Sequence, residues 1–232
     1  MMGEATLRTI MRERTLLIDD DAFELSTLAS AMRLHGINLV GEATNLALAA
    51  NLFRTLEPEV IVIDVQFNSD GGIPFAKSLR KLSPQLGIVL TTTCPDLRLL
   101  GLDEKEIPMG TQVVLKKCIG DLNVICTAIP DSVLAVQSDE KMMWMNDHTP
   151  VREGALISNV HQLTDIQIET LRLVATGMSN AEIGRTRFVS EKSVEQIVAR
   201  IAQHLGLAPS RTHNLRVLMA GAYFKWVGVT RR

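Results

Sequence analysis

Two different hydrophobic patterns divide this chain into an N-terminal and a C-terminal part. From residue 15 to about 137, short unbroken apolar runs alternate with stretches whose apolar residues recur at helical spacing. Unbroken apolar strands between helices are typical of a parallel sheet that is covered on both faces. The runs predict five strands, at residues 15–18, 37–40, 60–63, 88–90 and 113–115.

The C-terminal part has only the helical pattern, and it carries regularly spaced helix start and stop signals. A hydroxyl residue followed three positions later by Gln or Glu predicts a capping box, and Gly after the last apolar residue predicts a helix end. A third helix is expected after Ser190, with a buried stripe at Val194, Val198, Ile201 and Leu205. The two capping boxes are Thr164 with Gln167 and Ser179 with Glu182, and the glycines are Gly177 and Gly206.

These residues resemble the LuxR-type DNA-binding domain. The matching blocks are LT at 163–164, LRLVATGMSNAEIG at 171–184, VSEKSV at 189–194, HLGL at 204–207 and SRT at 210–212. The resemblance implies a helix-turn-helix, which places one helix in the DNA major groove. The alternative is a helical oligomerisation module that uses the same helix caps.

The expected recognition helix, residues 191–205, departs from the family. Where the family commonly has basic or hydrogen-bonding residues, this chain has Glu195, Gln196 and Ala199. Glu195 would repel phosphates unless it accepts a hydrogen bond from a cytosine, and Gln196 can pair with adenine. We expect selective but weak binding, with a DNA surface that includes Ser193 and draws its positive charge from Lys192, Arg200, Arg185, Arg187 and Arg211.

In the N-terminal part, polar residues follow the predicted strands directly. They are Asp19, Asp20 and Asp21 after the first strand, Asp64 after the third, Thr91 after the fourth and Lys116 after the fifth. Sites in parallel sheets lie beyond the carboxyl ends of the strands. Carboxylates that converge there repel one another unless a cation lies between them, and oxygen ligands suit Mg2+.

This arrangement resembles the receiver domain of two-component response regulators. The resemblance implies that Asp64 accepts a phosphoryl group and that Asp19, Asp20 and Asp64 bind Mg2+. It also implies supporting roles for Thr91 and Lys116, for which Thr92 and Lys117 are the competing assignments. The fold class expected is α/β, a doubly wound five-stranded parallel sheet (receiver-like, flavodoxin-like) followed by a small all-α helix-turn-helix domain.

Three departures from the receiver pattern affect how a signal would be transmitted. Residues 67–69 differ from the usual loop after the phosphoacceptor, although Gly72 is in its expected place. Val113 replaces the aromatic residue that often lies three positions before the lysine. Pro130 is expected to interrupt the last receiver helix, because proline cannot donate the helical hydrogen bond.

Composition and charge agree with two joined domains in the cytoplasm. Residues 160–232 have a net charge of +5 and residues 1–159 one of -7, so a basic part follows an acidic one. The three cysteines show no metal spacing and are expected to be free thiols. We expect neither a signal peptide nor a membrane span, since no apolar stretch is long enough.

The leading interpretation is a DNA-binding transcriptional response regulator of the NarL type, without enzymatic turnover. Residues 14–137 would form the receiver, 138–162 a linker and 163–232 the DNA-binding domain. The expected partners are a histidine kinase, double-stranded promoter DNA and a second copy of the chain, joined through an apolar final helix from Leu215 to Trp226. Two alternatives remain: a pseudo-receiver controlled by a ligand or partner without phosphorylation, and a Mg2+-dependent hydrolase with Asp64 as nucleophile.

Overall fold

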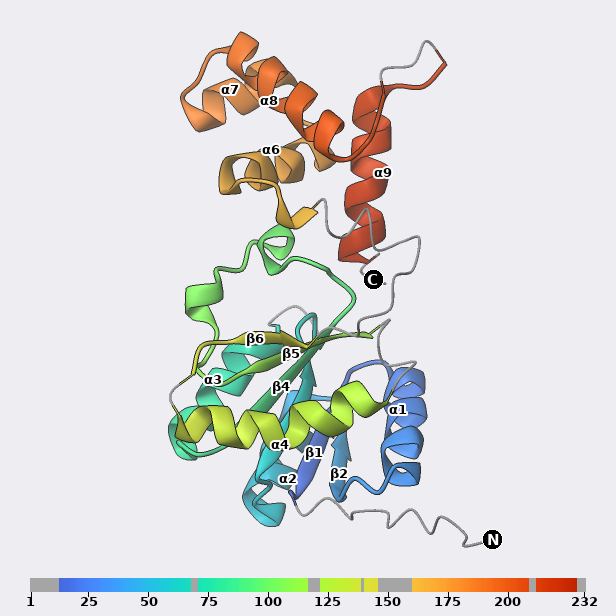
Figure 1. Cartoon of the computed structure of the whole chain (residues 1–232), viewed down its shortest axis with the longest axis vertical. Coiled ribbons are helices and arrows are strands. Elements are labelled where there is room, and N and C mark those ends of the chain that lie inside the picture. Colours follow the sequence, from blue (N-terminus) through green and yellow to red (C-terminus); the bar gives the residue numbers. More distant parts are fainter. Residues whose placement is uncertain are drawn as a thin grey trace, which may run out of the picture. The chain divides into compact units, whose positions relative to one another are not determined.

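The computed structural model divides the chain into two compact units (Figure 1). One unit comprises residues 1–92 and 105–147, and the other comprises residues 93–104 and 148–232. Among the described residues, no helix is long and apolar enough to cross a membrane. The structure describes residues 13–67, 71–116, 122–138, 140–145, 160–208 and 212–228.

The first unit is built on a parallel sheet in the order β2-β1-β3-β4-β5-β6. The parallel α/β class is confirmed, and the sheet contains all five predicted strands. A sixth strand comes from the expected linker and pairs in parallel with β5. The strands are β1 (Thr15–Ile18), β2 (Leu39–Ala43), β3 (Val60–Asp64), β4 (Gly87–Thr92), β5 (Gln112–Leu115) and β6 (Met143–Met145).

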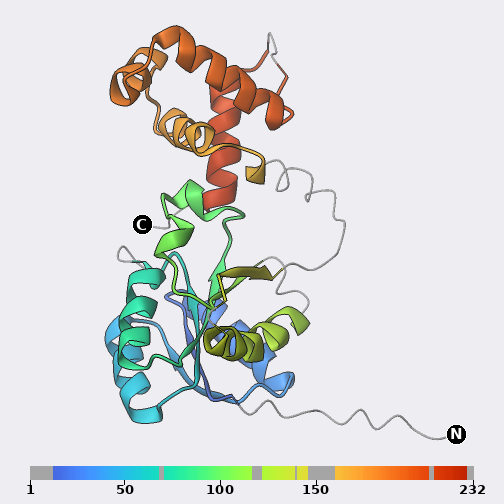
Figure 2. The same ribbon diagram turned by 60° about the vertical axis from the view of Figure 1, so that its left-hand side comes forward.

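Helices cover both faces of the sheet, as expected for fully buried strands. Helices α1 (Ala22–Leu34) and α4 (Asn123–Gln137) pack on one face, and α2 (Leu46–Leu56) and α3 (Gly72–Leu82) on the other (Figures 1 and 2). Helix α1 buries one apolar face, formed by Leu25, Leu28, Ala29 and Met32 at helical spacing.

The expected interruption at Pro130 was wrong. Helix α4 continues through it to Gln137. Ile125, Ala128 and Ile129 on its apolar side are buried against the sheet, and this packing outweighs the loss of one backbone hydrogen bond.

The connection from β4 to β5 departs from simple strand–helix alternation. Between residues 93 and 111, all of which are described, it contains only the 3-10 helices η1 (Leu97–Leu100) and η2 (Glu104–Glu106). Residues 93–104 of this connection belong by their contacts to the second unit.

The second unit is helical, with helices α6 (Asp165–Ala175), α7 (Asn180–Arg187), α8 (Glu191–His204) and α9 (Leu215–Val227). Thr164 and Gln167 form a complete capping box, while the Ser179 and Ser190 side chains accept backbone hydrogen bonds at the starts of α7 and α8. Gly177 and Gly206 adopt positive φ after α6 and α8, as their positions predict. The predicted α8 stripe is buried in full: Val194, Val198, Ile201 and Leu205.

Candidate acidic site and nucleic-acid interface

The order of the strands explains why the acidic residues meet. The chain leaves β1 for β2 on one side and β3 for β4 on the other, so the crevice at the strand ends opens between β1 and β3. Asp19 follows β1 and Asp64 ends β3. Carboxylate oxygens of Asp19, Asp20 and Asp64 all lie within 4.8 Å of one another. Asp19 and Asp64 are buried, 2% and 8% exposed, and Asp20 is exposed.

Asp21, the third acidic residue of the run, has a different role. Its side chain accepts hydrogen bonds from the backbone N–H groups of Phe23, at 2.9 Å, and Glu24, at 3.0 Å. It is therefore the N-cap of α1. Its own N–H donates to Asp19 Oδ1 at 3.0 Å, which helps to orient the Asp19 carboxylate.

Lys116 lies at the centre of the acidic cluster. Its Nζ donates to Asp19 Oδ2 and Asp64 Oδ2, each at 2.9 Å, and to Glu24 Oε2 at 2.5 Å. Burial alone lowers the pKa of Lys116, but the charge of Asp64 and the bonds to Glu24 and Asp19 raise it above its ordinary value. The ammonium therefore stays charged and uses its three donors on three carboxylates.

Glu24 is a member of the site that the sequence analysis missed. It lies on the first turn of α1, three residues after the N-cap, so helix geometry turns it toward the strand ends. The available signal was its acidic character beside the Asp19–Asp21 run. An acidic residue in the first turn of a helix is also favourable for the helix dipole, so the sequence alone does not separate the two roles.

Burial raises the pKa of Asp19 above its ordinary value, although Lys116 and the Asp21 N–H oppose the shift. A divalent cation would offset the free-energy cost of burying the charged carboxylates, because it would replace the hydration that they lose. The donors are hard oxygens, two of them on buried carboxylates and one on an exposed one, which leaves room for water ligands. This donor set fits Mg2+.

Thr91 lies opposite Asp64 in the β3–β4 register. Residues paired across parallel strands share a face of the sheet, whereas Thr92, the next residue, points to the other face. A backbone hydrogen bond joins the ends of β3 and β4 at the same point, since Val65 N–H donates to the Thr91 carbonyl at 2.9 Å. This geometry favours Thr91 over Thr92 beside Asp64. Lys117, the alternative to Lys116, lies outside the described residues.

The backbone of Gly72 passes very close to the backbone of Asp64. A Cβ at this position would lie 2.0 Å from the Asp64 carbonyl oxygen, well inside van der Waals contact. The start of α3 can therefore pass behind Asp64 only because residue 72 has no side chain. Of the residues expected in the preceding loop, Phe67 is fully buried, and 68 and 69 lie outside the described residues.

In the second unit, helices α7 and α8 form the helix-turn-helix pair. Lys192, Glu195, Gln196 and Arg200 on α8 are exposed, on the opposite side of the helix from its buried stripe. Ser193 is half-buried, and its backbone N–H donates to Ser190 Oγ at 3.1 Å. The structure thus presents Glu195 and Gln196 on one outward face with two basic residues.

The other basic residues expected on the DNA surface differ in their exposure to solvent. Arg185 on α7 is exposed and pairs with Glu182. The Arg187 side chain is only 13% exposed, because its guanidinium donates to the Ile166 carbonyl at 3.0 Å and to Thr170 Oγ1 at 2.5 Å. Arg187 thus fastens α7 to α6. Arg211 lies outside the described residues.

Comparisons with known proteins agree with this geometry. A family model described as response regulator receiver domain matches residues 15–129, and one described as bacterial regulatory proteins, luxR family, matches residues 161–218. The chain is 28% identical over 202 residues to the transcriptional regulatory protein LiaR of Bacillus subtilis, covering 84% of this chain and 92% of LiaR. It is 30% identical over 80 residues to the chemotaxis protein CheY of Thermotoga maritima, covering 34% and 67%.

A solved structure supports the fold over most of the chain. The two-component response regulator RcsB, in a complex with DNA, aligns with a TM-score of 0.51 at 22% identity, covering 93% of this chain and 98% of RcsB. With a parallel sheet that gathers acidic residues at its strand ends, a helix-turn-helix after it and a family match to each, the chain belongs to the response regulators of the NarL type, in which a receiver domain precedes a LuxR-family DNA-binding domain.

Proposed function

We propose that this protein is a transcription regulator whose DNA binding is controlled by phosphorylation of Asp64 by a histidine kinase, with Mg2+ bound by Asp19, Asp20 and Asp64. The observation that carries the proposal is Lys116, held at 2.9 Å from Asp64 Oδ2 by a buried ion pair. A phosphoryl group on Asp64 would gain a counter-charge already in place. Residues 14–137, 138–162 and 163–232 remain our proposed receiver, linker and DNA-binding segments.

The chemistry is transfer of a phosphoryl group to a carboxylate. An Asp64 oxygen forms the new bond to phosphorus, while the bond from phosphorus to the kinase imidazole nitrogen breaks and leaves its electron pair on that nitrogen. Bound Mg2+ supplies charge stabilisation for the phosphoryl oxygens. Lys116 orients Asp64 and then pairs with the added oxygens, and the Thr91 hydroxyl lies on the same face to donate to them.

The Mg2+ part of the proposal predicts the effect of Asp20→Ala. Because Asp20 is exposed, its removal should leave the fold unchanged but take one carboxylate from the cation site. We expect Mg2+ affinity to fall about tenfold or more, measured by titration calorimetry. Asp103→Ala, an exposed carboxylate elsewhere in the chain, is the control. Unchanged Mg2+ affinity in Asp20→Ala would place the cation elsewhere.

The DNA-binding unit would bind promoter DNA through the outward face of α8. We assign Gln196 and Glu195 to base contacts, supported by Ser193, and Lys192, Arg200 and Arg185 to phosphates. We place Arg187 in the packing of α7 on α6 instead, because its guanidinium is already bonded there. Genomic footprinting with and without beryllofluoride, a phosphoryl mimic, tests both the DNA binding and its control.

Glu195→Lys is predicted to relax DNA specificity. The exposed carboxylate on α8 repels phosphates, and a lysine there would instead neutralise one. We expect higher affinity for unrelated DNA and a salt dependence steeper by about one phosphate contact. Anisotropy titrations at several salt concentrations measure both quantities, with Glu106→Lys as a charge-matched control outside the helical unit. If the two variants behave alike, Glu195 does not face the DNA.

Helix α9 is proposed to mediate dimerisation on DNA. Met219 and Trp226 are buried within its own unit, yet Val217 is 67% exposed and Phe224 48% exposed. These apolar side chains fit a symmetric contact with a second copy, and two-fold symmetry would give paired half-sites. On a duplex with two half-sites, sedimentation should show two copies of the full chain for the wild type and one for Val217→Glu. Leu82→Glu, exposed on α3, is the control.

The second candidate is a pseudo-receiver controlled by a ligand or partner without phosphorylation. Titration with beryllofluoride and Mg2+ separates the two, because a pseudo-receiver would not bind the mimic at Asp64. Under either candidate the protein acts where promoter DNA is, so we place it in the cytoplasm. We assign it no catalytic turnover of its own.

A further inference from the structure

The connection that follows β4 is built into the core of the helical unit. We call residues 93–104 the β4–β5 strap. Cys94 and Leu99 are both 0% exposed and belong to the same apolar cluster as Leu171 of α6 and Met219 of α9. Burial raises the pKa of the Cys94 thiol to about 12, so this side chain serves as an uncharged apolar contact. Core contacts of this kind are absent from an ordinary surface loop.

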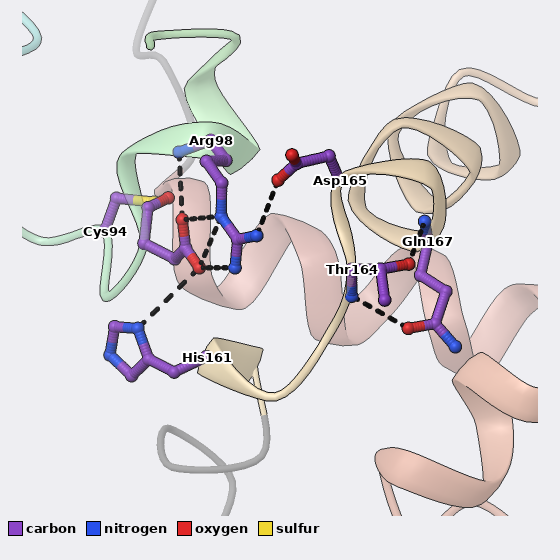
Figure 3. A network of polar contacts seen from close by, with 7 residues as sticks. Cys94, Arg98, His161, Thr164, Asp165 and Gln167 are labelled. Carbon is purple, nitrogen blue, oxygen red and sulfur yellow. Dashed lines mark hydrogen bonds and ion pairs between the residues drawn. The ribbon is translucent and has the colours of Figure 1, made fainter. Parts of the chain in front are cut away.

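A polar network fastens the strap to α6 (Figure 3). Asp96, 5% exposed, accepts from Arg98 Nη2 at 2.7 Å, and Arg98 Nη1 donates to Asp165 Oδ1 at 2.8 Å in the first turn of α6. The hydrogen bond that Arg98 donates to Asp96, followed by the one to Asp165, raises the pKa of Arg98 above its ordinary value. His161 Nδ1 lies 3.7 Å from Asp96 on the other side. One arginine thus joins a buried strap carboxylate to an exposed helix carboxylate.

Helix α9 contacts the strap as well. Tyr223 Oη donates to the Leu99 carbonyl at 3.1 Å. Within the strap, Leu99 N–H donates to the Asp96 carbonyl and Leu102 N–H to the Leu97 carbonyl. These bonds give the strap a defined shape in which Leu99 is presented to both helices.

The other end of the strap continues directly into the candidate phosphorylation site. Thr91, opposite Asp64 in the sheet, is separated from the strap by Thr92 alone. A shift of the Thr91 backbone would be passed along the covalent chain, because only Thr92 and Thr93 separate Thr91 from the buried Cys94. The strap has no α-helix that could absorb such a shift by rotating as a body.

We propose that the β4–β5 strap is the element that couples the state of the Asp64 site to helices α6 and α9 of the DNA-binding unit. The proposal rests on the proposed function for the nature of the signal. The strap would bias α9, the helix assigned to dimerisation, through Leu99 and Tyr223, and α6 through Arg98 and Asp165. Coupling requires that the strap remain docked, so weakening its contacts should uncouple the two sites while leaving each site able to bind.

The first arm of the test measures docking in the full chain and needs no phosphoryl mimic. Amide hydrogen exchange should show Leu99 and Leu102 protected at the level of the α6 and α9 core. The double variant Asp165→Asn/Tyr223→Phe should exchange about tenfold faster at these amides, with α8 unchanged. Exchange at the rate of an open loop in the wild type would overturn the proposal.

The second arm measures coupling as the ratio of DNA affinities with and without beryllofluoride and Mg2+. In the double variant this ratio should be at least about threefold closer to one than in the wild type. The affinity of the double variant for beryllofluoride without DNA should be unchanged. Glu104→Gln, an exposed substitution within the strap that removes one negative charge as Asp165→Asn does, should keep the wild-type ratio. An unchanged ratio in the double variant would overturn the proposal.

The two arms also separate failure of the strap from failure of the proposed function. Fluorine NMR of bound beryllofluoride reports on the Asp64 site directly. If the mimic does not bind the wild type, phosphorylation at Asp64 fails, and the strap is then decided by the exchange arm. If it binds and changes DNA affinity equally in the wild type and the double variant, only the strap fails.

Discussion

Asp64→Asn should abolish formation of an acyl phosphate while leaving the receiver fold intact. The amide has nearly the shape of the carboxylate but is not a nucleophile toward phosphorus. Lys116 keeps its bonds to Asp19 and Glu24, so the buried ammonium retains two partners. Incubation with a small phosphoryl donor and Mg2+, followed by phosphate-affinity electrophoresis, should show no shifted band.

The control for Asp64→Asn is Asp103→Asn, which changes an exposed carboxylate outside the acidic cluster and should be labelled like the wild type. Circular dichroism of both variants confirms that folding is not the cause of any loss. Persistent labelling of Asp64→Asn at wild-type level would show that the acceptor is another residue, and Asp20 would be the first to examine.

Gly72→Ala should have the largest effect on stability. A Cβ at residue 72 would lie 2.0 Å from the Asp64 carbonyl oxygen and 3.0 Å from its carbonyl carbon. Both are backbone atoms of a buried strand, so neither can move without disturbing β3. We expect a loss of about 3 kcal/mol or more in the free energy of unfolding, measured by urea titration. Because the displaced group belongs to Asp64, beryllofluoride affinity should fall as well.

Gly221→Ala is the matched control, since it adds the same methyl group to a glycine with nothing within 4 Å of the added Cβ. Gly221 lies inside α9, where alanine is a better helix former, and the substitution should stabilise the protein by up to about 1 kcal/mol. If Gly72→Ala were no more destabilising than Gly221→Ala, the close passage of α3 behind Asp64 would be wrong.

Much of the fold followed from local patterns. The β1 strand and the buried stripe of α8 are as predicted from spacing alone, because each depends only on which residues are apolar and how far apart they are. The sequence also predicted which polar residues lie at strand ends, because a buried strand stops where its apolar run meets a polar residue. These residues are Asp19, Asp64, Thr91 and Lys116.

Three features required the tertiary structure. Glu24 joins the acidic cluster only because the side chain of Lys116, which comes 92 residues later in the chain, donates a hydrogen bond to it. Arg187 has the charge of a phosphate contact, yet its position against α6 gives it carbonyl and hydroxyl partners within the unit. Pro130 is tolerated because the sheet buries the apolar side of α4.

The sequence by itself determined the two domain types, because their signals are local: strand-end polar residues in one and helix caps with an apolar stripe in the other. Only the tertiary structure decided where residues 93–104 belong. Their sequence places them between two receiver strands, but Cys94 and Leu99 complete the apolar cluster of the helical unit. A hydrophobic pattern records that a side chain is buried, and the packing of distant elements decides which core receives it.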